Sequence, residues 1–91
     1  MTVEGQLLEA RPSAAICLAL ADAANNCINN YDARCTLTLR NGAQFTGRLD
    51  KDPDGFFTNA HMKNDYKGWI TVDSLEIVAV EVYLRTQRGT S

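Results

Sequence analysis

The strongest constraint on this fold is a stretch of alternating apolar and polar residues, 34–50, that is interrupted once by a turn signal. On each side of the turn, every second residue is apolar or a glycine, as a half-buried strand requires. Asn41 and Gly42 readily adopt the positive backbone angles of a tight hairpin turn. Gly47 lies inside the returning strand, where a sheet can bend sharply. The stretch therefore predicts a β-hairpin with a bent second strand.

Three further short strands are predicted after this hairpin. A turn signal at 52–55 precedes the first of them, and the last is apolar enough that we expect it to be deeply buried. The predicted strands are Phe56 to about Met62, Trp69 to Val72 and Ile77 to Leu84, joined by a polar loop at 63–68 and a short link at 73–76. The polar tail, 85–91, is expected to be mobile.

An amphipathic helix is predicted before the strands, over about residues 12–28. Pro12 is placed in the first turn, where a proline is best tolerated. Ile16, Leu20 and Cys27 recur at the spacing that gives a helix one apolar face. Four asparagines between residues 25 and 30 favour local side-chain bonds over helical ones, so the helix should end before Tyr31.

The chain length selects the fold class. Ninety-one residues make one domain, which we place at 12–84 after an N-terminal segment, 1–11. The predicted β structure, at about residues 31–84, has too few residues to cover a two-layer sandwich. The sequence therefore predicts a mainly β fold, with an N-terminal α-helix followed by a five-stranded, strongly bent small barrel.

The charge balance limits the classes of partner. Nine Lys and Arg residues face eleven Asp and Glu residues, for a net charge of −2. This balance argues against capture of nucleic acid through a broad phosphate footprint. A small positive site remains compatible with it, because net charge does not say where the cations lie.

The cysteines and the single histidine limit the chemistry. Cys17, Cys27 and Cys35 are an odd number without close paired spacing, which indicates buried reduced thiols in a cytoplasmic protein. With His61 they are too few and too scattered for a zinc site, so we expect no metal and no cofactor. No nucleophile can be placed beside His61, and we expect no enzyme activity. No apolar run approaches the roughly 20 residues of a membrane span, so no membrane partner is expected.

The order of elements and the glycine spacing resemble the Sm and Sm-like (Hfq-type) family. The resemblance covers about residues 31–84 and the helix before them. The first motif of that family is matched in its framework by Leu37, Leu39, Gly42, Phe45, Gly47 and Leu49. The frame of the second motif holds Val72, Asp73, Ser74, Ile77, Val78 and Val80. The resemblance implies a ring of identical subunits that binds single-stranded RNA.

The RNA-binding signature of that family is largely replaced in this chain. Pro53 and Phe57 occupy the positions where the resemblance expects an aspartate and an asparagine. Asp73 and Ser74 occupy those of the arginine and the glycine, so an anion stands where the family has a cation. Asp52 or Asp54, and Asn59, can take the roles of the aspartate and the asparagine only with a register shift.

Aromatic residues next to loops are the candidate RNA contacts. Strand alternation leaves one ring of Phe56 and Phe57 exposed for stacking on a base, and sends the other into the core. The loop at 63–68 and its flank combine aromatic rings with a cation, in Tyr66, Lys67 and Trp69. An alternative interpretation is that Trp69 packs under the helix. The candidate RNA-binding residues are Phe57, Asn59, Lys67 and Trp69.

The arginines leave two interpretations open. Arg34, Arg40 and Arg48 have the same parity on paired strands and can form a basic stripe. Asp32 and Asp50 lie close in sequence, and we favour a solvated surface of ion pairs.

Self-association is predicted from the last strand. Ile77–Leu84 is apolar, and an open edge of this kind favours pairing with the fourth strand of a neighbouring copy. The candidate interface residues are Trp69, Ile70, Val72, Val78, Val80 and Val82. We therefore predict an Sm-like homo-oligomeric ring with single-stranded RNA as its partner. The alternative is an Sm-like or SH3-like barrel that serves as a structural module or binds a protein partner, without binding nucleic acid.

Overall fold

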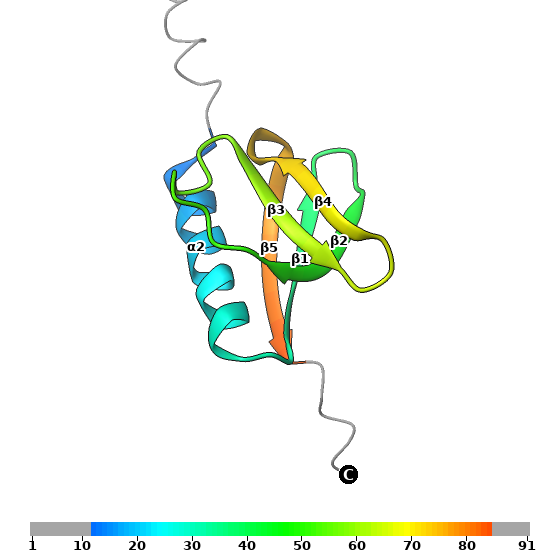
Figure 1. The fold of residues 1–91 in the computed structure, drawn as a ribbon. Coiled ribbons are helices and arrows are strands. Elements are labelled where there is room, and N and C mark those ends of the chain that lie inside the picture. The colour runs from blue at the N-terminus through cyan, green and yellow to red at the C-terminus, as the bar shows by residue number, and fades with distance from the viewer. Residues whose placement is uncertain (1–11, 85–91) are drawn as a thin grey trace, which may run out of the picture.

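The computed structural model describes residues 12–84, and the predicted N-terminal segment and polar tail lie outside the described residues. Within these residues, one helix is followed by five strands, with a single turn of 3-10 helix between the fourth and the fifth (Figure 1). The elements are α2 (Ala14–Asn29), β1 (Ala33–Leu39), β2 (Gln44–Leu49), β3 (Asn59–Asn64), β4 (Gly68–Asp73), η1 (Ser74–Glu76) and β5 (Ile77–Leu84). The predicted mainly β architecture, with an N-terminal helix before five strands, is confirmed.

The five strands form one antiparallel sheet in the order β4-β3-β2-β1-β5, and the sheet bends within β2. Gly47 pairs with Cys35 of β1, whereas the next residue, Arg48, pairs with Lys63 of β3. A Cβ atom at Gly47 would collide with the carbonyl group of Lys63. Only glycine lets β3 approach β2 this closely, so the bend predicted at this residue is confirmed. The bent sheet makes a small barrel-like fold, and α2 lies along β5 (Figure 1).

The helix begins at Ala14, two residues later than expected. Ser13 is the N-cap, and its Oγ accepts a hydrogen bond from the backbone N–H of Ile16 at 3.1 Å. Pro12 therefore precedes the cap and does not lie in the first turn. The helix ends at Asn29, before Tyr31 as predicted. Its buried residues are Leu20, Ala23, Ala24 and Cys27.

The third strand starts later than predicted. Phe56 has a φ of 64°, which no strand residue adopts, and β3 begins only at Asn59. The side chain of Asp52 stabilises a turn at this point, because its Oδ2 accepts a hydrogen bond from the backbone N–H of Phe56 at 2.7 Å. The turn sends the Phe56 ring into the core and leaves Phe57 46% exposed. One ring is thus buried and one exposed, but a turn decides this and not strand alternation. The predicted loop at 63–68 is also shorter, since β3 continues to Asn64.

The prediction of a deeply buried last strand is wrong. Ile77 is the buried residue of β5, Val80 is half-buried, and the other six are exposed. The physical reason is topology: β5 is an edge of the sheet and pairs with β1 alone among the described strands. The apolar side chains of β5 are therefore largely exposed within one copy of the chain, and its composition alone does not predict burial.

The thiols of Cys27 and Cys35 are buried in the core, and Cys17 is half-buried. Burial raises the pKa of the Cys35 thiol from 9.0 to about 12, and the adjacent Cys27 adds to the shift.

Cys35 should therefore make folding sensitive to alkaline pH. The unfolded chain loses this proton near pH 9, while the folded chain keeps it to about pH 12, so the free energy of unfolding falls as the pH rises through this range. Urea unfolding at several pH values measures the slope. A Cys35→Ala variant should have a shallower slope, and an equal slope in both proteins would contradict the assignment.

Candidate nucleic-acid interface

The outer face of the β3–β4 hairpin carries three polar or aromatic cross-strand pairs. The pairs are Asn59 with Asp73, His61 with Thr71, and Lys63 with Trp69. Among the alternate residues, Ala60, Met62 and Val72 are buried in the core and Ile70 is half-buried. His61 Nδ1 and Thr71 Oγ1 lie 3.0 Å apart and join the strands in the middle of this face. The period of two therefore sorts the hairpin into an apolar inner face and an outer face with mixed chemistry.

The predicted RNA-binding residues are spread along this hairpin. Asn59 and Trp69 share its outer face but lie near opposite ends, about 13 Å apart at roughly 3.3 Å per residue. Lys67 lies in the turn between the strands, where its backbone N–H donates to Asn64 Oδ1 at 2.8 Å. Phe57 lies in the loop before β3. The structure thus does not gather the four residues into one pocket.

The end of the hairpin that carries Asp73 has a polar cleft of about 330 Å³. Its lining residues are Thr58, Asn59, Thr71 and Asp73. Asp73 Oδ1 accepts a hydrogen bond from the backbone N–H of Leu75 at 3.0 Å and so caps η1. The anion at this position is explained by the turn that it begins.

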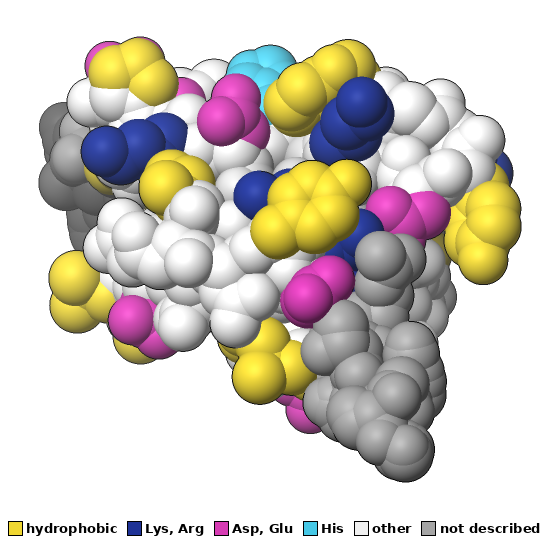
Figure 2. All heavy atoms as spheres, turned by 60° about the horizontal axis from the view of Figure 1, so that its bottom comes forward, with side chains coloured by type: hydrophobic (Ala, Val, Ile, Leu, Met, Phe, Trp, Pro, Cys, Tyr) yellow, Lys and Arg dark blue, Asp and Glu magenta, His cyan; other side chains and the backbone are white. Residues whose placement is uncertain are grey.

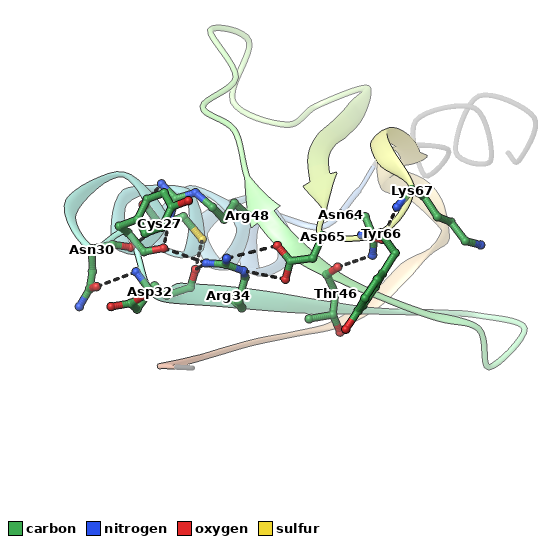
Figure 3. Close-up of polar contacts among 12 residues, drawn as sticks. Cys27, Asn30, Asp32, Arg34, Thr46, Arg48, Asn64, Asp65, Tyr66 and Lys67 are labelled. Carbon is green, nitrogen blue, oxygen red and sulfur yellow. Dashed lines mark hydrogen bonds and ion pairs between the residues drawn. The ribbon is translucent and has the colours of Figure 1, made fainter. Parts of the chain in front are cut away.

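Arg48, from β2, closes the C-terminus of the helix. Its guanidinium donates to the carbonyl oxygens of Cys27 at 2.6 Å, Tyr31 at 2.6 Å and Asn30 at 3.1 Å (Figure 3). These carbonyls lack helical partners, and a cation there also complements the helix dipole. The guanidinium carbon lies 4.9 Å from the centroid of the Tyr31 ring. The ring is therefore backed by a fixed cation.

Arg34 is buried beneath the same ring, and the prediction that it belongs to a solvated surface is wrong. It is 2% exposed and forms two hydrogen bonds of 3.2 Å with the carboxylate of Asp65, which comes from the β3–β4 turn (Figure 3). It also donates to the carbonyl oxygens of Tyr31 at 2.8 Å and Ala33 at 3.0 Å. The acid that pairs with Arg34 is 31 residues away, because the bent sheet folds the hairpin tip back over β1.

The cations of these strands therefore do not form a basic stripe, which was the less favoured of the two interpretations. Arg40 is exposed near η1, donating to the carbonyl oxygen of Leu75 at 2.7 Å and lying 4.0 Å from Glu76. Arg48 and Arg34 are both committed to the junction between the helix and the sheet.

Two neighbouring clefts surround Tyr31, Lys63 and Trp69. Arg48 and Lys63 line both clefts. The first has about 330 Å³ and is lined by Tyr31, Arg34, Arg48, Lys63, Asn64 and Asp65. The second has about 240 Å³ and is lined by Ile28, Arg48, Leu49, Asp50, Lys63 and Trp69. Together they hold three cations and two carboxylates, in a chain whose net charge is negative. On one face of the molecule, Figure 2 shows hydrophobic side chains interleaved with those of Lys and Arg.

The exposed members of this group are two aromatic rings and one lysine. Tyr31 is 73% exposed and Trp69 is 61% exposed, so Trp69 does not pack under the helix. The ammonium group of Lys63 has no ion pair or hydrogen bond with any residue in 12–84. Sequence reasoning found Trp69 and missed Tyr31 and Lys63. Tyr31 and Lys63 are 32 residues apart, so no local sequence pattern links them. The one hint in the sequence was that an aromatic ring and a cation are suited to binding nucleic acid.

The predicted interface residues lie on the two edges of the sheet. Trp69, Ile70 and Val72 are on β4, and Val78, Val80 and Val82 are on β5. Trp69, Val78 and Val82 are exposed, whereas Val72 is buried and faces the core. Each edge pairs with a single neighbouring strand within the described part of the chain.

Three comparisons, with protein-family models, with curated proteins and with solved structures, found no match to the chain. No helix within residues 12–84 has the length and apolar character needed to cross a membrane. In the same range, no three His, Cys, Asp or Glu side chains are grouped so that they could hold a metal ion.

Proposed function

We propose that this protein is an Sm-like barrel that assembles into a homo-oligomeric ring and binds single-stranded RNA. The observation that carries the proposal is that β4 and β5 are the two edge strands of the sheet, and within residues 12–84 each pairs with one neighbouring strand. An apolar edge strand exposes unpaired backbone groups and favours pairing with another chain. Head-to-tail pairing of β4 with β5 of the next copy satisfies both edges and generates a ring when the rotation closes.

One antiparallel register matches the two edges along their whole overlap. It places residues on the core side of the sheet opposite one another, and residues on the outer side opposite one another. The pairs are Trp69–Tyr83, Ile70–Val82, Thr71–Glu81, Val72–Val80 and Asp73–Ala79. A shift of two residues instead sets Asp73 opposite Glu81, and two directly opposed carboxylates are destabilising.

This register predicts the oligomer and its contacts. Sedimentation velocity at micromolar concentration should give a species several times heavier than the 10.0 kDa chain. A Thr71→Cys, Glu81→Cys double variant should form disulfide-linked ladders on non-reducing gels. The matched control, Thr71→Cys with Tyr83→Cys, belongs to the shifted register and should form few. A single 10 kDa species contradicts the ring, and equal ladders in both variants contradict the register.

RNA binding is supported by the exposed rings and the unpaired lysine on the same side of the molecule. Base stacking on an aromatic ring needs only an exposed π face, and Tyr31 and Trp69 both offer one. In this role the protein is a binding scaffold and not an enzyme. The three free thiols support a reducing, cytoplasmic location.

A second candidate function is a protein-interaction module without nucleic-acid binding. It is favoured by the exposed apolar side chains at the end of β5, which are Val82, Tyr83 and Leu84. Such an edge can accept a strand from another protein. A salt titration of binding to uridine-rich and adenine-rich oligonucleotides separates the two functions, because phosphate contacts weaken as salt rises. Undetectable binding at low salt leaves the interaction module.

A further inference from the structure

We infer that the surface formed by Tyr31, Arg48, Lys63 and Trp69, here called the aromatic–cation surface, binds single-stranded nucleic acid without selecting base or sugar. Two rings stack bases on either side of a lysine that binds the intervening phosphate. The inference rests on the proposed nucleic-acid function, but it places the contact away from the loop end at Asn59 and Asp73, to which the family resemblance points.

The Tyr31 ring is held in place by its surroundings. The Arg48 guanidinium lies 4.9 Å from the ring centroid and is itself fixed by three carbonyl oxygens. The Arg34 guanidinium, 5.9 Å from the same centroid, is fixed by Asp65 and two carbonyl oxygens. Despite this support, the ring remains 73% exposed. A ring that is immobilised on one side and open on the other loses little freedom when a base stacks on it.

Lys63 lies between the two rings. It pairs directly with Trp69 across the β3–β4 ladder and also lines the cleft that contains Tyr31. Its ammonium group makes no ion pair or hydrogen bond with the described residues, so it is available for a phosphate. Two carboxylates share the clefts. Asp65 is held by Arg34, and Asp50 accepts a hydrogen bond from the backbone N–H of Lys51 at 2.9 Å.

The absence of selectivity follows from how the polar groups of the clefts are occupied. The terminal nitrogens of Arg48 donate to three carbonyl oxygens. Four hydrogen bonds hold the guanidinium of Arg34 to Asp65 and to two more carbonyl oxygens. The amide of Asn64 donates to the carbonyl oxygen of Thr46 at 2.7 Å, and its oxygen accepts from Tyr66 and Lys67 at 2.8 Å. What faces a ligand is chiefly two π faces and one ammonium group. Stacking on a π face and an ammonium–phosphate contact depend little on which base is present or on a 2′-hydroxyl.

The repeat of ring, cation and ring favours nucleic acid over an acidic peptide. A peptide carboxylate would use Lys63 but would leave both exposed rings without a partner. A nucleotide chain supplies planar bases on either side of each phosphate, which matches all three groups.

Fluorescence anisotropy with labelled 15-nucleotide oligo-dT, oligo-U and oligo-dA tests the site. All three should bind with similar affinity, and duplex DNA should bind far more weakly. Tyr31→Ala and Trp69→Ala should each weaken binding about five- to a hundredfold. Lys63→Gln should weaken all three alike and flatten the dependence on salt. The matched controls are Tyr66→Ala, an exposed ring outside both clefts, and Lys51→Gln, and neither should change binding.

Several outcomes would overturn the site. They are equal losses in the control variants, a preference for one base or for RNA, or competition by polyglutamate as effective as that by oligo-dT. Binding that is lost in Asn59→Ala but kept in Tyr31→Ala and Lys63→Gln moves the contact to the loop end and leaves the proposed function intact. The absence of binding to every oligonucleotide refutes the inference and RNA binding together. Sedimentation of each variant shows separately whether the assembly survives, which matters for Trp69 because it also lies on the β4 edge.

Discussion

Replacing Gly47 with alanine should lower the free energy of unfolding by about 3 kcal/mol. The new methyl group would occupy the position of the Lys63 carbonyl group and would also approach Asn64 Cα at 3.1 Å. Both contacts are with backbone, which cannot rotate away as a flexible side chain does. The strands must therefore separate where the sheet bends, and the hydrogen bonds between β2 and β3 weaken.

Urea unfolding followed by far-UV circular dichroism measures this loss. The matched control is Gln44→Ala, an exposed position on the same strand, where we expect a change below about 1 kcal/mol. The two variants should also differ in Trp69 fluorescence, because only Gly47→Ala displaces the β3–β4 hairpin. Equal stabilities for the two variants would show that the bend does not depend on the close approach at Gly47.

Replacing Asp65 with asparagine should cost about 3 kcal/mol of folding stability. The side chain of Arg34 is 3% exposed, whereas that of Asp65 is 37% exposed, so the arginine is the partner that cannot regain water. Loss of the carboxylate leaves a buried guanidinium without its counter-charge. The same change releases the hairpin tip from β1 and should loosen the support beneath Tyr31.

A double-mutant cycle isolates the pair. Arg34→Met combined with Asp65→Asn should cost clearly less than the sum of the two single variants, because the double variant buries no unpaired charge. Asp32→Asn is the control, since sequence proximity suggested Asp32 as a partner but the structure pairs Arg34 with Asp65. Additive losses, or an Asp32→Asn loss as large as that of Asp65→Asn, would contradict this account.

Most of the fold could be predicted from local patterns. The period of two defined the first hairpin, and Gly47 marked its bend because glycine in a strand interior has few other uses. Element bounds were less accurate where a side chain bonds the backbone. Asp52 holds the N–H of Phe56, and this bond turned a predicted strand residue into a turn residue. Strand propensity could not reveal such a bond.

The candidate site was harder to predict than the fold. Trp69 could be identified from its residue type and its place beside a loop. The partners that complete the surface come from the turn after α2, from β2 and from β3, and nothing in the local sequence relates them. The ion pair between Arg34 and Asp65 spans 31 residues and arises only because the hairpin folds back.

The sequence by itself determined the number, type and order of the elements, because apolar periodicity and turn chemistry act over a few residues. It also determined that β5 is apolar. Only the tertiary structure decided which of these apolar side chains are exposed to solvent. Burial depends on which strands end as edges, and contact between distant residues depends on how the sheet bends. For this reason the apolar β5 is an exposed edge, Arg34 is buried, and Tyr31, Lys63 and Trp69 form one surface.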